Sequence, residues 1–169
     1  MDARQSGGDA GAGEYDVVIV GGAAAGLATA ACLAAVGVAP GRVLVVEPHA
    51  RSGDVWRRRY RCLKLHDIRA ECDLPLVPML PTTAGDAAVD AARYPEFVPA
   101  AAFADYLDRY ATATGANVAH RTRVVRVEAT GGPCERAGTP GGGWRVALAT
   151  DAGNGDDGGH LYDDRSLHG

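Results

Sequence analysis

The feature that most constrains the fold is an apolar run that ends in a glycine-rich turn near the start of the sequence. Residues Tyr15–Val20 are mostly β-branched and are bounded by Gly21 and Gly22. A short, continuous apolar run predicts a strand buried on both faces, as in a parallel sheet. The alanine-rich segment from Ala24 to about Val36 predicts a helix, and Gly37 stands where a helix C-terminus favours glycine. The turn therefore joins a strand to a helix.

A second strand completes this first unit. After Pro40 and Gly41, residues Arg42–Val46 are again apolar, and Glu47 follows them directly. Two strands joined by a crossover helix run parallel. The first part of the chain therefore predicts an α/β fold, a Rossmann-like domain built on a parallel sheet.

The turn matches a dinucleotide-binding fingerprint of the form G-x-A-x-x-G. The first glycine permits the tight turn, and the last lets the helix approach the strand. The N-terminus of the helix offers free N–H groups and the positive end of its dipole to a pyrophosphate. At the middle position an alanine replaces the usual glycine, and we expect its methyl group to displace the phosphate or to weaken binding. The six residues are Gly21, Gly22, Ala23, Ala24, Ala25 and Gly26.

An acid at the end of the second strand supports this interpretation. Glu47 lies 21 residues after Gly26, close to the spacing of about 20 at which an acid bonds a ribose hydroxyl. Its charge opposes a 2′-phosphate and so favours FAD or NAD over NADP at the turn. The alternative is a tight strand-to-helix turn that binds no ligand.

The rest of the chain predicts a loop-rich segment, a second helix and a small β-meander. Residues 48–81 are irregular and carry large apolar side chains, which is typical of a segment that covers a ligand. A helix is expected from about Pro99 to Thr114, with Phe103, Tyr106, Leu107 and Tyr110 on its buried face. Strands are expected over 117–119, 122–130 and 144–149.

These elements predict one domain over residues 15–150. We expect residues 1–14 to form a disordered leader, 82–92 a flexible insertion and 151–169 a disordered tail, because these segments are small, polar or glycine-rich.

Charge and composition exclude several classes of function. The net charge is −4, and the arginines do not gather into one stripe, so we expect no nucleic-acid partner. No apolar run approaches the roughly 20 residues of a membrane span, and no secretory signal is visible, so we expect a cytoplasmic protein. The four cysteines include no C-x-x-C pair, and we assign no metal site. The oligomeric state does not follow from the sequence.

Over about residues 15–150, a series of motifs resembles the flavin-containing monooxygenases, and it is most similar to the plant YUCCA-type branch that makes auxin from indole-3-pyruvate. The most specific of these motifs are Leu63–His66 and Cys72-x-Leu-Pro75. The others, in the family's order, are the Tyr15–Gly26 turn, Glu47, Trp56, Tyr60, Tyr94-Pro95 and the segment Phe103–Ala111.

The resemblance implies a cofactor, a reductant and a substrate. FAD would lie on the glycine turn, NADPH would reduce it, and the reduced flavin would react with oxygen to oxygenate a small molecule, with indole-3-pyruvate expected. Gly21, Gly22, Ala23 and Gly26 match the phosphate turn, Glu47 the ribose-binding acid, and Trp56 the tryptophan of the FAD-covering loop. His66 matches a histidine near the flavin ring and is the candidate catalytic residue. Alternatively, Trp56 is a core aromatic and His66 an ordinary loop histidine.

Family members carry a second glycine fingerprint for NADPH, and no counterpart is visible here, because the later glycine clusters lack the flanking strand and helix. We therefore expect the FAD-binding part of a monooxygenase, without the NADPH site. Three functions stay open: a monooxygenase whose activity belongs to a longer product, a non-catalytic FAD-binding remnant or interaction module, and an NAD(H)-binding module of another oxidoreductase. The motifs Leu63–His66 and Cys72–Pro75 argue against the third.

Overall fold

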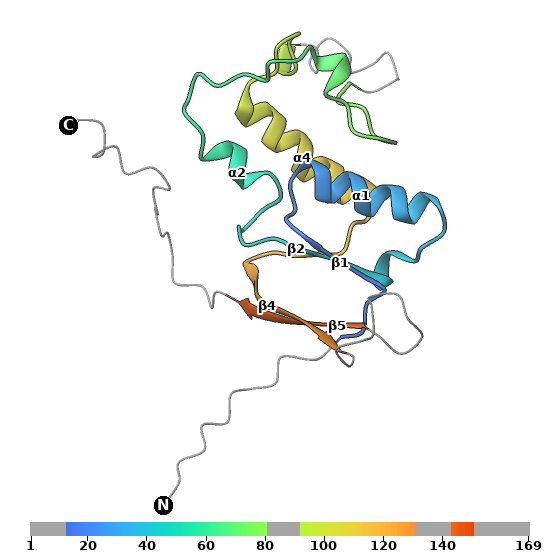
Figure 1. Cartoon of the computed structure of the whole chain (residues 1–169). Coiled ribbons are helices and arrows are strands. Elements are labelled where there is room, and N and C mark those ends of the chain that lie inside the picture. The colour runs from blue at the N-terminus through green and yellow to red at the C-terminus, as the bar shows by residue number, and fades with distance from the viewer. Residues whose placement is uncertain (1–12, 81–91, 131–142, 151–169) are drawn as a thin grey trace, which may run out of the picture.

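A three-stranded parallel sheet with the order β1-β2-β3 organises the computed structural model, which describes residues 13–80, 92–130 and 143–150. Helices α1 and α4 cover one face of this sheet, and the antiparallel pair β4–β5 lies on the other side (Figure 1). In chain order the elements are β1 (Val17–Val20), α1 (Ala24–Ala35), η1 (Pro40–Arg42), β2 (Val43–Val46), α2 (Asp54–Arg57), η2 (Arg69–Glu71), α4 (Ala100–Thr114), β3 (Val118–Ala119), β4 (Thr122–Thr130) and β5 (Gly143–Thr150).

The strand pairing confirms the predicted parallel unit. Val17 pairs with Val43 across β1 and β2, and Val45 pairs with Val118 across β2 and β3. The segment predicted as a strand over 117–119 thus joins the parallel sheet as β3. The antiparallel part consists of β4 and β5, with an irregularity in register between Val124 and Arg126.

The first strand is less buried than predicted. Residues Val17–Ile19 are half-buried, and Val20 is 68% exposed. The reason is position: among the described strands β1 lies at an edge of the sheet, whereas all four residues of the central strand β2 are buried.

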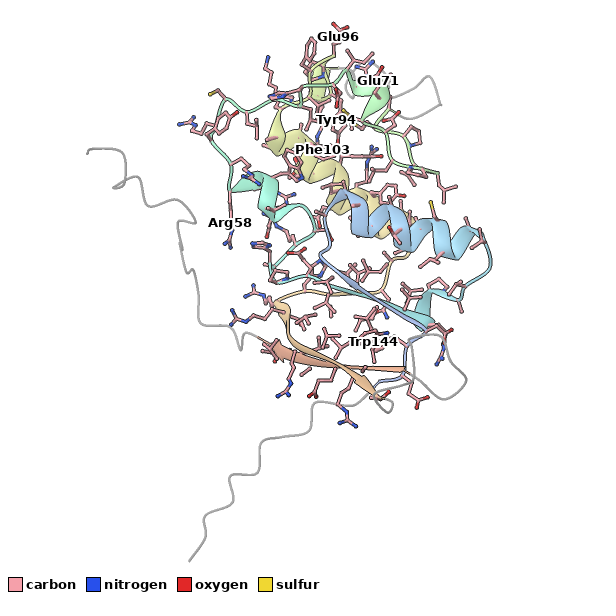
Figure 2. The ribbon with its side chains drawn as sticks, viewed as in Figure 1. Arg58, Glu71, Tyr94, Glu96, Phe103 and Trp144 are labelled. Atoms are coloured by element: carbon pink, nitrogen blue, oxygen red, sulfur yellow. The ribbon has the colours of Figure 1, made fainter. Side chains whose placement is uncertain are left out.

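The main core lies between α4, α1 and the loop-rich segment. The predicted buried face of α4 is confirmed, because Phe103, Tyr106, Leu107 and Tyr110 are all nearly inaccessible. They pack against Leu27 of α1 and against three residues outside the helices, Met79, Tyr94 and Val98. Figure 2 shows Tyr94 and Phe103 on this side of the molecule.

Tyrosine hydroxyls of α4 hold the loop-rich segment in place. Tyr106 Oη accepts a hydrogen bond from Leu74 N at 2.7 Å and donates one to Val77 O at 2.7 Å. Tyr110 Oη donates to Pro75 O at 2.8 Å. Burial raises the pKa of Tyr106 to about 12. The loop-rich segment is therefore held against the core by these hydrogen bonds as well as by apolar packing.

Ion pairs fix the short helix α2 against α4. Arg57 Nη1 lies 2.8 Å from Asp54 Oδ1, and Arg57 Nη2 lies 2.8 Å from Asp105 Oδ1. Partial burial acts to raise the pKa of Asp105, but the hydrogen bonds from Arg57 and Arg93 outweigh it and lower that pKa. This network sets the position of α2 and of the residues that follow Glu47.

Three predicted segments fall largely or wholly outside the described residues. They are the leader over 1–14, apart from Gly13 and Glu14, the insertion over 82–92, apart from Ala92, and the tail over 151–169.

Candidate functional site

The glycine turn has the tight geometry that its sequence predicts. Gly21 adopts φ +101°, a conformation that favours glycine, and its N–H donates to Val46 O at 2.8 Å. A Cβ added to Gly26 would lie 1.9 Å from the carbonyl oxygen of Gly21. Any larger residue at position 26 would force the helix away from the strand. The structure therefore requires glycine at both Gly21 and Gly26.

The helix that follows begins without a side-chain cap. Ala23 is the N-cap residue, with φ −91° and ψ −169°, and its methyl side chain accepts no hydrogen bond from the helix. The first turn of α1 also contains no acidic residue. The N–H groups at such a helix start need acceptors, and the dipole favours an anion there. This is the arrangement that a pyrophosphate requires.

Glu47 lies directly against the turn. Its carboxylate is buried, and Oε2 accepts a hydrogen bond from the backbone N–H of Gly22 at 2.7 Å. A Cβ on Gly22 would lie 3.0 Å from Glu47 Cβ and 3.1 Å from Oε2. Gly22 is therefore the residue that permits the acid to approach, a role that the sequence fingerprint alone does not assign to it.

A histidine that the sequence reasoning missed completes the environment of this acid. Oε1 of Glu47 accepts a hydrogen bond from the backbone N–H of His49 at 2.9 Å and lies 2.5 Å from His49 Nδ1. The available signal was the spacing Glu47-Pro-His49, which places an imidazole two residues beyond the strand-end acid.

These residues meet at the carboxyl ends of adjacent parallel strands. Gly21 follows β1, and Glu47 follows β2. Ligands of open α/β sheets bind at this edge. The described residues fit the diphosphate and ribose of a dinucleotide: an uncapped helix start, a turn narrowed by two glycines, and one carboxylate beside them. The backbone of Ala23 is extended, so alanine is accommodated there without strain.

Trp56, also a predicted cofactor contact, lies on α2 and not in the turn. Its ring meets that of Phe103 edge-on, with the centroids 5.1 Å apart and an interplanar angle of 87°. It is partly buried against the main core. This contact gives Trp56 a packing role, and its contact with FAD stays a prediction.

His66 lies among residues other than those of the glycine turn. It lines an open groove of about 450 Å³ together with Tyr60, Cys62, Lys64, Leu65 and Phe97, a set that contains no residue of the glycine turn. The structure thus brings Glu47 to the turn but groups His66 with other residues. The role of His66 beside a flavin stays a prediction.

The family follows from a match over most of the chain. A family model described as FAD-NAD(P)-binding matches residues 18–154. The chain belongs to the FAD-NAD(P)-binding family. That membership accounts for the parallel sheet, the glycine turn and the strand-end acid together.

Two plant proteins are similar to part of this chain. Indole-3-pyruvate monooxygenase YUCCA1 of Oryza sativa subsp. japonica is 39% identical over 99 residues, which is 58% of this chain and 21% of that protein. The probable indole-3-pyruvate monooxygenase YUCCA9 of Arabidopsis thaliana is 39% identical over 95 residues, covering 56% of this chain and 19% of its own length. The match thus spans about a fifth of these relatives.

A solved structure supports the fold of this FAD-NAD(P)-binding chain. The flavin monooxygenase from Stenotrophomonas maltophilia, as a Q193R H194T mutant, superposes with a TM-score of 0.54 at 24% identity. The superposition covers 68% of this chain and 30% of that one.

The described residues contain neither a cluster of metal ligands nor a membrane-spanning helix. Within residues 13–80, 92–130 and 143–150, no group of three or more His, Cys, Asp or Glu side chains is arranged to hold a metal ion. In the same part of the chain, no helix has both the length and the apolar character needed to cross a membrane.

Proposed function

We propose that this chain binds FAD at the Gly21–Gly26 turn and forms the FAD-binding part of an NADPH-dependent flavin monooxygenase. One observation carries the proposal: the buried Glu47 carboxylate accepts the Gly22 N–H at 2.7 Å, next to an uncapped helix N-terminus. A site for a diphosphate and an acceptor for a ribose hydroxyl therefore lie side by side at the ligand-binding edge of the sheet.

The helix N-terminus, two glycines of the turn and Glu47 have different parts in binding. The N–H groups at the start of α1 donate to the pyrophosphate, and Gly21 and Gly26 keep the turn narrow enough for that approach. Glu47 accepts a hydrogen bond from the adenosine ribose, and its charge opposes a 2′-phosphate. FAD is preferred over NADP at this turn for that reason.

Bound FAD would supply hydride acceptance and oxygen chemistry that no side chain provides. Trp56, on the segment after Glu47, would cover the cofactor, and His66 would donate or accept a hydrogen bond near the flavin ring. These two assignments rest on the matching sequence motifs.

The substrate proposal comes from the two plant relatives, whose names specify indole-3-pyruvate monooxygenases. We assign the NADPH site and the oxidation of indole-3-pyruvate to the whole enzyme. The match covers about a fifth of those relatives, and among the described residues the fingerprint G-x-A-x-x-G between a strand and a helix occurs at Gly21–Gly26. This chain alone should therefore bind FAD without consuming NADPH.

A second candidate is an FAD-binding module that acts through a partner protein without catalysis of its own. Two apolar side chains favour it, because Val20 at the edge of the sheet is 68% exposed and Trp144 on β5 is 59% exposed. Figure 2 shows Trp144 on the side of the sheet opposite the helices. Exposed apolar side chains are typical of interaction surfaces where they form a contiguous patch.

Titration with FAD tests the proposal. Purified chain should quench flavin fluorescence and retain one flavin per chain through gel filtration, and a chain that ignores FAD would contradict it. NADPH oxidation under air then separates the two candidates: turnover by a complex with a second polypeptide supports the monooxygenase, and its absence from every such complex supports the module.

A further inference from the structure

Three donors hold the side chain of Glu47. It receives the Gly22 N–H on Oε2, and both the N–H and the imidazole Nδ1 of His49 on Oε1. A buried carboxylate without such partners would be strongly disfavoured. Two of these three interactions come from a single residue, His49.

His49 is itself fixed independently of the acid. Its carbonyl oxygen accepts a hydrogen bond from Arg121 N at 2.9 Å, which ties it to the turn between β3 and β4. Arg121 has φ +52°, a left-handed conformation that is uncommon for a residue with a side chain. The imidazole is mostly buried, with 18% of its side chain exposed. His49 is therefore a rigid support between two strand ends.

The three donors leave Glu47 able to take one more. A carboxylate has about four acceptor positions, and the contacts to Gly22 and His49 use three of them. Because these contacts fix both oxygens, the direction of the remaining acceptor position is fixed as well. A ribose hydroxyl that arrives there meets an acceptor already oriented, without a loss of side-chain freedom on binding.

We propose that His49 is a positioning residue of the nucleotide site, which orients the Glu47 carboxylate toward the ribose of the bound dinucleotide. The proposal rests on the proposed function, since it concerns the same site. It adds that recognition of the ribose depends on a side-chain N–H at position 49, which neither the glycine fingerprint nor the strand-end acid predicts.

Three substitutions separate the N–H from the rest of the side chain. His49→Ala removes the ring, His49→Phe keeps the ring but removes the donor, and His49→Asn retains an N–H at the position that corresponds to Nδ1. His120→Asn is the matched control, because His120 lies at the end of the neighbouring strand and its Nε2 is 3.2 Å from Ser52 Oγ. Circular dichroism melting shows which variants are folded. If His49→Ala does not fold, His49→Phe alone tests the loss of the side-chain N–H.

The measurement compares ADP with 2′,3′-dideoxy-ADP, which keeps the diphosphate and adenine but lacks the ribose hydroxyls. Wild type should prefer ADP by about tenfold, the value of one hydrogen bond to a charged acceptor. The preference should fall to about twofold or less in His49→Ala and His49→Phe, and it should persist in His49→Asn and His120→Asn. A general structural defect would weaken both ligands alike and leave their ratio unchanged.

Two results would overturn the inference about His49, and both can be told apart from a failure of FAD binding itself. An unchanged preference in the folded Ala and Phe variants would show that Glu47 needs no support from His49. An equal loss of affinity for both ligands would assign His49 a structural role only. If wild type binds neither FAD nor ADP, the proposed function fails first, and the role of His49 fails with it.

Discussion

The carboxylate of Glu47 and the backbone N–H of Gly22 are joined by a hydrogen bond of 2.7 Å, although 25 residues separate them. The bond links the end of β2 to the turn after β1, and it exists because glycine leaves room for the acid. A ligand that bridges these two strand ends meets both groups at once.

Replacement of Glu47 by alanine should weaken FAD binding by about tenfold or more. The change removes the acceptor for the ribose hydroxyl, which costs about 1–3 kcal/mol of binding free energy. Isothermal titration with FAD measures the loss. Glu71→Ala is the control, since Glu71 is an exposed acid of η2. Equal affinity in Glu47→Ala and wild type would mean that the acid does not touch the ribose.

Replacement of Ala23 by glycine should tighten FAD binding several-fold. Ala23 occupies the place where the fingerprint has its second glycine, and loss of the methyl group lets the backbone approach the pyrophosphate. Because Ala23 is the N-cap and precedes the helix, the change has little cost in helix propensity. Unchanged affinity would count against a pyrophosphate at this turn.

Replacement of Gly26 by alanine should disrupt the turn itself. The new Cβ would lie 1.9 Å from Gly21 O, so α1 or β1 must move, at a cost of about 3 kcal/mol or more. Urea unfolding measures the change. Gly41→Ala is matched to it, because a Cβ at position 41 meets no atom within 4 Å. Similar unfolding midpoints for the two variants would refute the tight geometry of the turn.

Replacement of Tyr106 by phenylalanine should destabilise the fold by about 1–3 kcal/mol, because Leu74 N–H and Val77 O both lose their partner. The exposed Tyr60 provides the control, and Tyr60→Phe should leave the melting temperature unchanged. If both variants melt alike, Tyr106 does not hold the loop-rich segment.

The same tyrosine predicts a dependence on alkaline pH. Its pKa of about 12 exceeds the ordinary value of 10.0, so the folded state binds this proton more tightly than the unfolded state does. The resulting stability is fully present below pH 10 and is lost as the pH rises from 10 towards 12. Burial also raises the pKa of Tyr110, so absorbance at the tyrosinate band should show more than one late-ionising tyrosine in wild type and one fewer in Tyr106→Phe.

The parallel unit was predictable because its signals are local. The β-branched run before Gly21, the alanine-rich helix that ends near Gly37 and the apolar strand before Glu47 each specify one element, and together they specify the topology. The buried face of α4 was equally visible in the spacing of Phe103 and Tyr106.

The remaining features depend on contacts between distant segments. The exposure of Val20 follows from the position of β1 at an edge, which no local pattern reveals. The support of Glu47 by His49 depends on side-chain geometry, and the placement of His66 in a separate groove depends on how the loop-rich segment packs. Motif spacing thus pointed to the acid and the turn but not to His49, which contacts the acid.

The most direct test of the central claim is the stoichiometry and affinity of FAD binding by the purified chain. The site described above predicts one flavin per chain, with an affinity in the micromolar range or tighter and with binding weakened in Glu47→Ala. A folded chain that binds no flavin, or that binds it equally well without Glu47, would contradict the assignment of this turn as the FAD site.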